Sequence, residues 1–372
     1  MKINLNSTFG LRLTKLILAI STILYAQNSS DDWQFFCLND FPLLGKGWDT
    51  TATKFSRLPA RAQVEVSEQV WKQAQSSAGL ALTFQTNSVR LKIRWRTTNN
   101  THLPHMTDIG TKGLDLYAWS EQEQKWRWAG CTKSYQAGPL FSSDLVSAMD
   151  SSVKTFMIYL PLYDSLDSLW LGVTPGAFIQ PYRSAFKSDQ PLVFYGTSIT
   201  QGGCASRPGM SYPAIIGRAL NYPCINLGFS GAGKMELALA HLLAELDAAA
   251  YIIDCLPNMT AEMVAKRVVP FVLELRKSRP SVPIILVSSF IYENAWLNSK
   301  ELQTLKAKNV NLLAAYYQLL QMNVKNIDLV SSEELQARFN DATVDGVHLT
   351  DAGFLRFADI LIPHIQHSIS KN

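Results

Sequence analysis

The segment 192–203 reads Leu-Val-Phe-Tyr-Gly-Thr-Ser-Ile-Thr-Gln-Gly-Gly. Four apolar residues follow Pro191 and end at Gly196, which is the pattern of a short buried strand in a parallel sheet. Because Gly196 carries no Cβ, we expect the chain to turn sharply there. Ser198 is then predicted just beyond the carboxyl end of a strand, where open α/β sheets bind their ligands. This segment alone leaves two interpretations of Ser198 open, a helix N-cap and a nucleophile.

A second segment, near the end of the chain, favours the nucleophile. Asp345-Gly-Val-His348 places a carboxylate and an imidazole three positions apart, so one tight turn can bring them together. A serine needs a neighbouring base to take its proton, and a carboxylate on the other ring nitrogen fixes the orientation of that base. The alternative for His348 is an ordinary surface or capping histidine.

Two more apolar runs end in polar or glycine-rich turns. The first leads into Asn226-Leu-Gly228-Phe-Ser-Gly231, and the second into Asp254-Cys-Leu-Pro-Asn258. Together with the two segments above they form an ordered set of four blocks. Such a set is far more specific than any one block alone.

These blocks resemble the SGNH, or GDSL-type, hydrolase family over roughly the C-terminal half of the chain. The resemblance implies that Ser198 is the nucleophile and that Asp345 and His348 complete a triad. It also implies an oxyanion hole of Ser198, Gly228 and Asn258. The first block has Gly-Thr-Ser where the family name has Gly-Asp-Ser, and Leu256 stands where many members have glycine. The turn at Ser198 lacks the Gly-x-Ser-x-Gly pattern, which disfavours an α/β-hydrolase fold.

Strands and helices alternate beyond residue 186, which predicts βαβ units around a parallel sheet. The resemblance implies a flavodoxin-like three-layer α/β/α sandwich with five strands in the order 2-1-3-4-5. We therefore predict a catalytic domain over residues 186–372. Its expected strands are 192–195, 224–227, 251–254, 284–287 and 326–330, and its expected helices are 212–220, 234–246, 261–276, 300–321 and a last one carrying Phe354 to Ile365.

The preceding part of the chain has an apolar period of two, as in residues 89–96, and turn formers separate its short runs. This pattern predicts an all-β sandwich or jelly roll over residues 27–185. Gly113-Leu-Asp-Leu-Tyr117 resembles the Gly-x-Asp-Leu-Tyr motif of an accessory domain that precedes some SGNH hydrolases. Stacking on sugars and packing in the core are both open roles for its tryptophans, which include Trp71, Trp95, Trp119, Trp126 and Trp128.

Residues 1–26 have the pattern of a secretory signal peptide. Three basic residues precede or flank an apolar run at 16–25, which is short for a membrane span, and Ala26 ends it. Export to the periplasm or the extracellular space is the expected location, with no membrane span left after cleavage. Removal of Lys2, Arg12 and Lys15 lowers the net charge from +4 to +1, which disfavours nucleic acid as a partner.

The sequence predicts no cofactor and no metal site. The 5 cysteines contain no Cys-x-x-Cys pair, and His102 and His105 have no further ligand cluster beside them. The loop that carries these two histidines could reach the catalytic cleft. Arg207 has two open interpretations, a ligand for an acidic sugar and a structural ion pair.

The expected function is hydrolysis of a small acyl ester, acetyl in the first place, on a carbohydrate such as an acetylated polysaccharide. The resemblance supplies the chemistry, a Ser-His-Asp triad with an acyl-enzyme, whereas fold analogy is a weaker guide to the substrate. Three alternatives stay open: a lysophospholipase or thioesterase, acyl transfer to a sugar, and a glycan-binding protein without activity.

Overall fold

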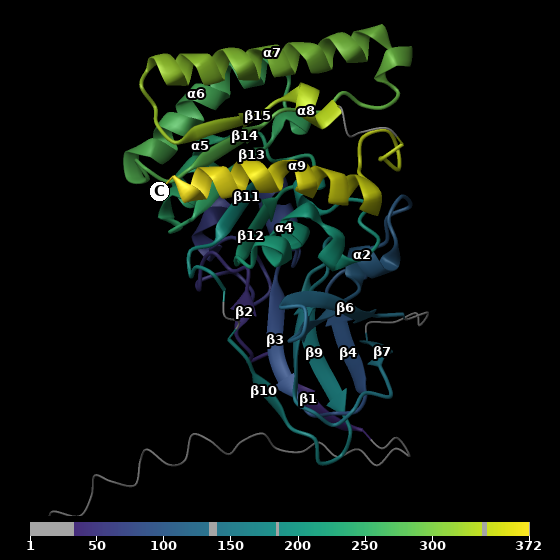
Figure 1. The fold of residues 1–372 in the computed structure, drawn as a ribbon. Helices are drawn as coiled ribbons and strands as arrows, with labels where there is room; N and C mark the ends of the chain where they lie inside the picture. The colour runs from purple at the N-terminus through teal and green to yellow at the C-terminus, as the bar shows by residue number, and fades with distance from the viewer. Residues whose placement is uncertain (1–32, 134–139, 184–185, 337–340, 372) are drawn as a thin grey trace, which may run out of the picture. The chain divides into compact units, whose positions relative to one another are not determined.

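A five-stranded parallel sheet lies at the centre of the C-terminal half (Figure 1). The computed structural model describes residues 33–133, 140–183, 186–336 and 341–371. The strands run in the order β12-β11-β13-β14-β15, which is the predicted order 2-1-3-4-5. Each lies within one residue of its predicted limits: β11 (Leu192–Gly196), β12 (Cys224–Gly228), β13 (Ala250–Asp254), β14 (Ile284–Val287) and β15 (Ile327–Val330).

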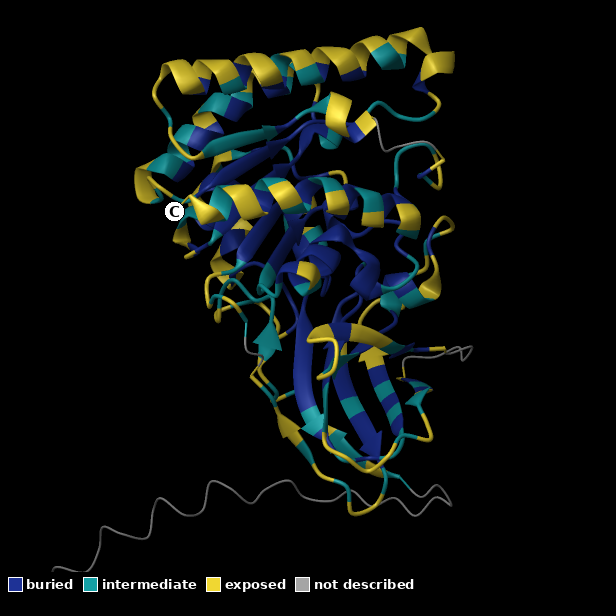
Figure 2. Ribbon diagram, in the orientation of Figure 1, coloured by how far each residue is buried: buried dark blue, intermediate teal, exposed yellow. Residues whose placement is uncertain are grey.

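Helices cover both faces of this sheet, because its strands are apolar on both sides. In β11, Val193 and Tyr195 point into one hydrophobic cluster and Leu192 and Phe194 into the other. The first cluster also contains residues of α5 (Leu237–Glu245), α6 (Ala261–Ser278) and α7 (Ser299–Gln321). The second contains residues of α4 (Tyr212–Leu220) and α9 (Asp351–Ser370). The strands are buried and the helices expose their outer sides, so the predicted three layers are confirmed (Figure 2).

The N-terminal half contains two antiparallel sheets, as the period of two predicted. Inward-facing residues of both sheets, among them Phe84, Trp95 and Phe156, form one hydrophobic core. The first sheet has the order β1-β9-β4-β7, with β1 (Gln34–Cys37), β9 (Leu166–Val173), β4 (Leu91–Thr97) and β7 (Leu140–Val146). The second has the order β10-β3-β8-β5-β6, with β10 (Ile179–Pro181), β3 (Ala81–Thr86), β8 (Lys154–Tyr159), β5 (Asp115–Ser120) and β6 (Lys125–Cys131), and β2 (Leu43–Leu44) pairs with β3.

The Gly-x-Asp-Leu-Tyr motif joins the two halves. Asp115 is fully buried, and its Oδ2 accepts hydrogen bonds from Arg207 Nη1 at 2.6 Å and from the Gly209 backbone N–H at 2.9 Å. Arg207 Nη1 also donates to the hydroxyl of Tyr117 at 2.6 Å. The structural interpretation of Arg207 is therefore correct, because Asp115 neutralises the charge that an acidic sugar would need.

Packing also explains the tryptophans of this region. Trp95 stacks on Phe141 in the core, and Trp126 is buried on the outer face of the second sheet in a cluster with Ala214 of α4. Trp128 is the exception, with half of its surface exposed, and its Nε1 donates to Asp115 Oδ1 at 3.0 Å.

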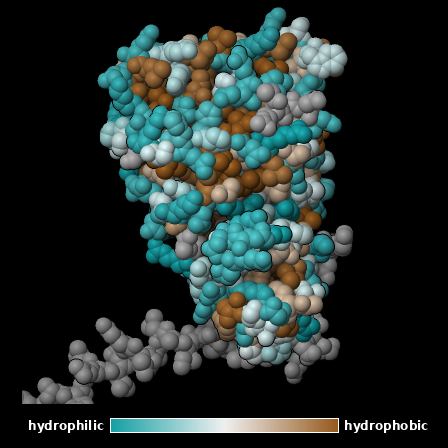
Figure 3. All heavy atoms as spheres, viewed as in Figure 1, coloured by the Kyte–Doolittle hydropathy of each residue, from teal (hydrophilic) through white to brown (hydrophobic). Residues whose placement is uncertain are grey.

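Residues 34–372 form one compact unit. The domain division at 185/186 stays a prediction from the sequence. The predicted signal peptide, residues 1–26, lies outside the described residues. Among the helices that the structure describes, none has both the length and the hydrophobicity needed to cross a bilayer. The face in Figure 3 mixes hydrophilic and hydrophobic residues.

Candidate active site

Ser198 is the first residue of a short helix, α3 (Ser198–Gln201), directly after β11. The cap of this helix is Thr197, whose Oγ1 accepts from the N–H of Ile199, while Thr200 Oγ1 accepts from the N–H of Thr197. The capping role that the sequence left open for Ser198 therefore belongs to its neighbour. The hydroxyl of Ser198 is free to make another contact.

That contact is with His348. Ser198 Oγ lies 2.9 Å from His348 Nε2, and His348 Nδ1 lies 2.7 Å from Asp345 Oδ2. The three side chains suggested by the sequence thus meet in one hydrogen-bonded chain, although Ser198 and His348 are 150 positions apart. The surface and capping interpretations of His348 do not account for this arrangement.

The loop 343–349 holds the imidazole in place. Asp345 Oδ1 accepts the backbone N–H groups of Val347 at 3.0 Å and His348 at 2.8 Å. Gly346, with φ +92°, has the left-handed conformation that this tight turn requires. Although burial raises the pKa of Asp345, hydrogen bonds from His348 and Val347 lower it below its ordinary value. An ionised carboxylate only accepts, so Nδ1 carries the proton and Nε2 is left to accept from Ser198.

Asn258 lies at the carboxyl end of the sheet, as predicted from its block. It ends a short 3₁₀ helix (Leu256–Asn258) after β13, and its Nδ2 donates to the carbonyl of Phe229 at 3.3 Å. This bond holds the amide against the turn that follows β12. The second amide hydrogen is left for another acceptor.

The geometry does not support the oxyanion role expected of Gly228. Its N–H donates to Asn226 Oδ1 at 2.9 Å, so an oxyanion would have to displace that bond. A Cβ at this position would lie 2.1 Å from the backbone nitrogen of Gln201. Glycine is therefore needed at 228 to let β12 pack against α3, rather than to present a donor.

Gly231, three residues after Gly228, is a second candidate donor that the sequence analysis does not name. It has φ +68° and is exposed, and no hydrogen bond engages its N–H within the described part of the chain. Both glycines belong to Asn226-Leu-Gly-Phe-Ser-Gly231. The sequence pattern does not show which of the two N–H groups is already engaged in a hydrogen bond within the protein.

A buried polar network supports α3 from below. Asp254 Oδ2 accepts from Thr200 Oγ1 at 3.1 Å. The single hydroxyl hydrogen of Tyr212 is shared between Thr200 Oγ1 at 3.0 Å and Asp254 Oδ2 at 3.2 Å. Because Thr200 closes the capping box, this network fixes the turn that carries Ser198. Burial raises the pKa of Asp254 to about 7, against the hydrogen bonds from Thr200 and Tyr212.

Stability should therefore fall as the pH rises toward 8. Unfolded Asp has a pKa of about 3.9, so between about pH 4 and 7 folded Asp254 keeps a proton that the unfolded chain releases. The contribution of Asp254 to the free energy of unfolding is fully present below about pH 4 and is lost as the pH rises through 7. The free energy of unfolding should be measured with urea at pH 5 and at pH 8. Its fall between these two pH values should be about 2–3 kcal/mol smaller in Asp254→Asn than in the wild type. Parallel pH dependences of the two proteins would contradict this assignment.

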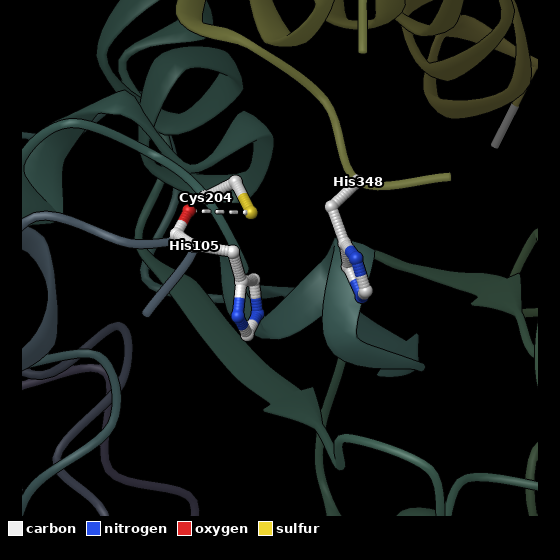
Figure 4. Close-up of side chains that lie close together, drawn as sticks. All are labelled: His105, Cys204 and His348. Carbon is white, nitrogen blue, oxygen red and sulfur yellow. Dashed lines mark hydrogen bonds between the residues drawn. The ribbon is translucent and has the colours of Figure 1, made fainter. Parts of the chain in front are cut away.

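Three potential metal ligands lie beside the triad. Ligand atoms of His105, Cys204 and His348 lie within 4.8 Å of one another (Figure 4). Metal binding at this cluster would need the thiolate of Cys204. Burial raises the pKa of the Cys204 thiol to about 12, and Sγ donates to the carbonyl of His105 at 3.2 Å. Without a metal the group is thus a protonated thiol that donates to a backbone carbonyl, and His348 Nε2 is already engaged by Ser198 Oγ.

The comparisons with known proteins agree with the fold and the order of the blocks. The model of the GDSL-like lipase/acylhydrolase family matches residues 189–366. The model of the Gly-x-Asp-Leu-Tyr N-terminus of SGNH-hydrolase-type esterases matches residues 32–179. The chain belongs to the GDSL-like lipase/acylhydrolase family, also called SGNH hydrolases. No curated protein sequence matches it.

Solved structures extend this result to nearly the whole chain. A protein described as a GDSL-like lipase from Bacteroides ovatus is 37% identical, with a TM-score of 0.85, over 91% of this chain and 98% of that one. The salicylyl-acyltransferase SsfX3 of a tetracycline biosynthetic pathway shares the fold at 16% identity and a TM-score of 0.72, with the same coverage. A family two carbohydrate esterase from Cellvibrio japonicus does so at 13% identity and a TM-score of 0.57, again over 91% and 98%.

Proposed function

We propose that this protein is an exported serine esterase that removes small acyl groups, acetyl in the first place, from carbohydrate. The observation that carries the proposal is the hydrogen-bonded chain from Ser198 through His348 to Asp345. A hydroxyl, an imidazole and an ionised carboxylate in this order are the parts of a nucleophilic triad.

The proposed reaction has two halves. His348 Nε2 takes the proton of Ser198 as Oγ attacks the ester carbonyl, and then gives that proton to the leaving alcohol. The acyl group stays on Ser198 as an ester. Water, activated in turn by His348, attacks this ester and releases the acid. Asp345 stabilises the imidazolium that forms in each half.

Three donors are proposed for the oxyanion. The N–H of Ser198 is at the start of α3, where a helix leaves its N–H groups without internal partners. The N–H of Gly231 takes the place that the sequence reasoning gave to Gly228. The side-chain amide of Asn258 lies against the same turn through its bond to Phe229.

Replacing Asn258 with alanine should lower kcat for p-nitrophenyl acetate by about 10²–10³, because one donor to the oxyanion is lost. KM should change little. Asn311→Ala is the matched control, since the amide of Asn311 also donates to a backbone carbonyl, that of Ala261, at 2.7 Å. Steady-state kinetics with near wild-type values for both variants would remove Asn258 from the site.

The shared fold supports a sugar ester as the substrate. The fold is shared with family two carbohydrate esterases, one of which, from Clostridium thermocellum, is described in complex with cellohexaose. Export would bring the enzyme to polymeric glycans outside the cell.

A panel of substrates tests the proposal. Purified protein should hydrolyse p-nitrophenyl acetate faster than the butyrate or the decanoate, and it should release acetate from at least one acetylated polysaccharide. A preference for long chains would favour the lysophospholipase alternative and reject the small-acyl proposal alone. Transfer of acetyl to an added sugar, seen by mass spectrometry, would favour the transferase. The glycan-binding alternative requires sugar affinity with no turnover of any ester.

A further inference from the structure

A loop of the β-rich half reaches the active site. Thr107 Oγ1 donates to the carbonyl of Ser206 at 2.6 Å, and Cys204 Sγ donates to the carbonyl of His105 at 3.2 Å. In the middle of the short helix α2 (Asp108–Lys112), a Cβ on Gly110 would lie 2.2 Å from the carbonyl oxygen of Ala205. Glycine at 110 thus allows α2 to press against the segment that follows α3. These contacts fix the loop beside the nucleophile.

The loop places the imidazole of His105 against that of His348. The ring centroids are 5.6 Å apart and the planes are inclined by 37° (Figure 4). His105 is exposed, and within the ranges that the structure describes its ring makes no hydrogen bond. His102, three positions earlier, instead binds Asp108 through Nδ1 at 2.8 Å. The two histidines of one loop therefore have different surroundings.

The position of His105 determines which part of a substrate it can meet. In the proposed reaction His348 Nε2 gives a proton to the leaving alcohol, so that alcohol must lie beside the His348 ring. A side chain packed against this ring borders the alcohol half of the ester rather than the acyl half. A neutral imidazole has one donor and one acceptor, which suits a hydroxyl group.

We infer that His105 is part of the substrate site and binds a hydroxyl on the alcohol half of the ester. This inference rests on the proposed esterase function and deepens it. It gives the β-rich half a direct part in specificity, because it supplies a recognition group to a site whose Ser198, His348 and Asp345 belong to the C-terminal half.

Two esters that differ in one group test the inference. 2-Hydroxyethyl acetate and propyl acetate have the same acyl group and nearly the same size, but only the first has a hydroxyl on its alcohol. Wild-type kcat/KM should favour the hydroxyl-bearing ester by about tenfold, the effect of one hydrogen bond. His105→Phe keeps an aromatic ring against His348. In this variant kcat/KM should fall for the hydroxyl-bearing ester alone, so that the ratio of the two kcat/KM values becomes about 1. His102→Phe is the matched control and should keep the wild-type ratio.

The outcomes separate the inference from the proposed function. A wild-type ratio near 1, or a preference that survives His105→Phe, overturns the role of His105 while the esterase stands. An equal loss of kcat/KM on both esters in His105→Phe would show that His105 only positions His348. This result would also overturn the inference that His105 binds a substrate hydroxyl. Turnover of either ester that survives Ser198→Ala would instead overturn the esterase mechanism, and turnover of neither ester by the wild type would reject both.

Discussion

Ser198→Ala should lower kcat for p-nitrophenyl acetate by about 10⁴–10⁶, with little change in KM. The hydroxyl makes the bond to the acyl group, and alanine offers no atom for that bond. The His348→Ala variant should lose a similar factor, because Ser198 Oγ then has no base within 2.9 Å. The double variant should be no slower than either single one, since the two groups act as a unit.

The matched control for this experiment is Ser206→Ala. Ser206 lies shortly after α3, and its hydroxyl donates to Asp351 at the start of α9. Its loss should leave kcat within about twofold of the wild type. Ser198→Ala with wild-type turnover in a stopped assay, on protein free of contaminating esterase, would exclude the nucleophilic role.

The second large effect concerns Arg57 and the stability of the fold. Arg57 is 2% exposed, and the described hydrogen bonds of its guanidinium go to neutral oxygens. Nη1 donates to the carbonyls of Asn226 at 3.0 Å and Gly228 at 2.8 Å, and Nη2 to that of Gln73 at 2.6 Å. Burial lowers the pKa of Arg57 to about 9, which still keeps it charged at neutral pH. Arg57 thereby ties the N-terminal half to the end of β12.

Arg57→Met should lower the free energy of unfolding by about 3–5 kcal/mol, because several buried carbonyls lose their donors at once. Urea unfolding followed by tryptophan fluorescence measures this loss. Arg61→Met is the control, since half of the Arg61 side chain is exposed and it pairs with Glu65 and Glu245 on the surface. It should lose no more than about 1 kcal/mol. Equal stability of Arg57→Met and the wild type would show that the buried network contributes nothing.

Local patterns predicted the sheet and the contact of Ser198, His348 and Asp345. The strands are short apolar runs that end in glycine or polar residues, so their positions and order follow from the chain itself. Asp345 and His348 are three residues apart, and a tight turn was enough to predict their contact. Ser198 was singled out by its place after β11, and the structure assigns the helix cap to Thr197, while the nucleophilic role of Ser198 stays a proposal.

Other parts of the site depend on contacts that no local pattern contains. The hydrogen bond from the Gly228 N–H to Asn226 Oδ1 favours Gly231 over Gly228 as the proposed oxyanion donor, and the sequence pattern does not reveal that bond. His105 comes from the other half of the chain, and only the tertiary structure places it beside His348. Arg57 is a buried charge without a described acidic partner, which composition and periodicity do not reveal.

Covalent trapping tests the central claim most directly. The protein should be treated with a fluorophosphonate, digested, and analysed by peptide mass spectrometry. We expect one stoichiometric adduct on Ser198, none in Ser198→Ala, and slow labelling in His348→Ala. An adduct on another residue, or esterase turnover that persists with Ser198 fully modified, would contradict the account.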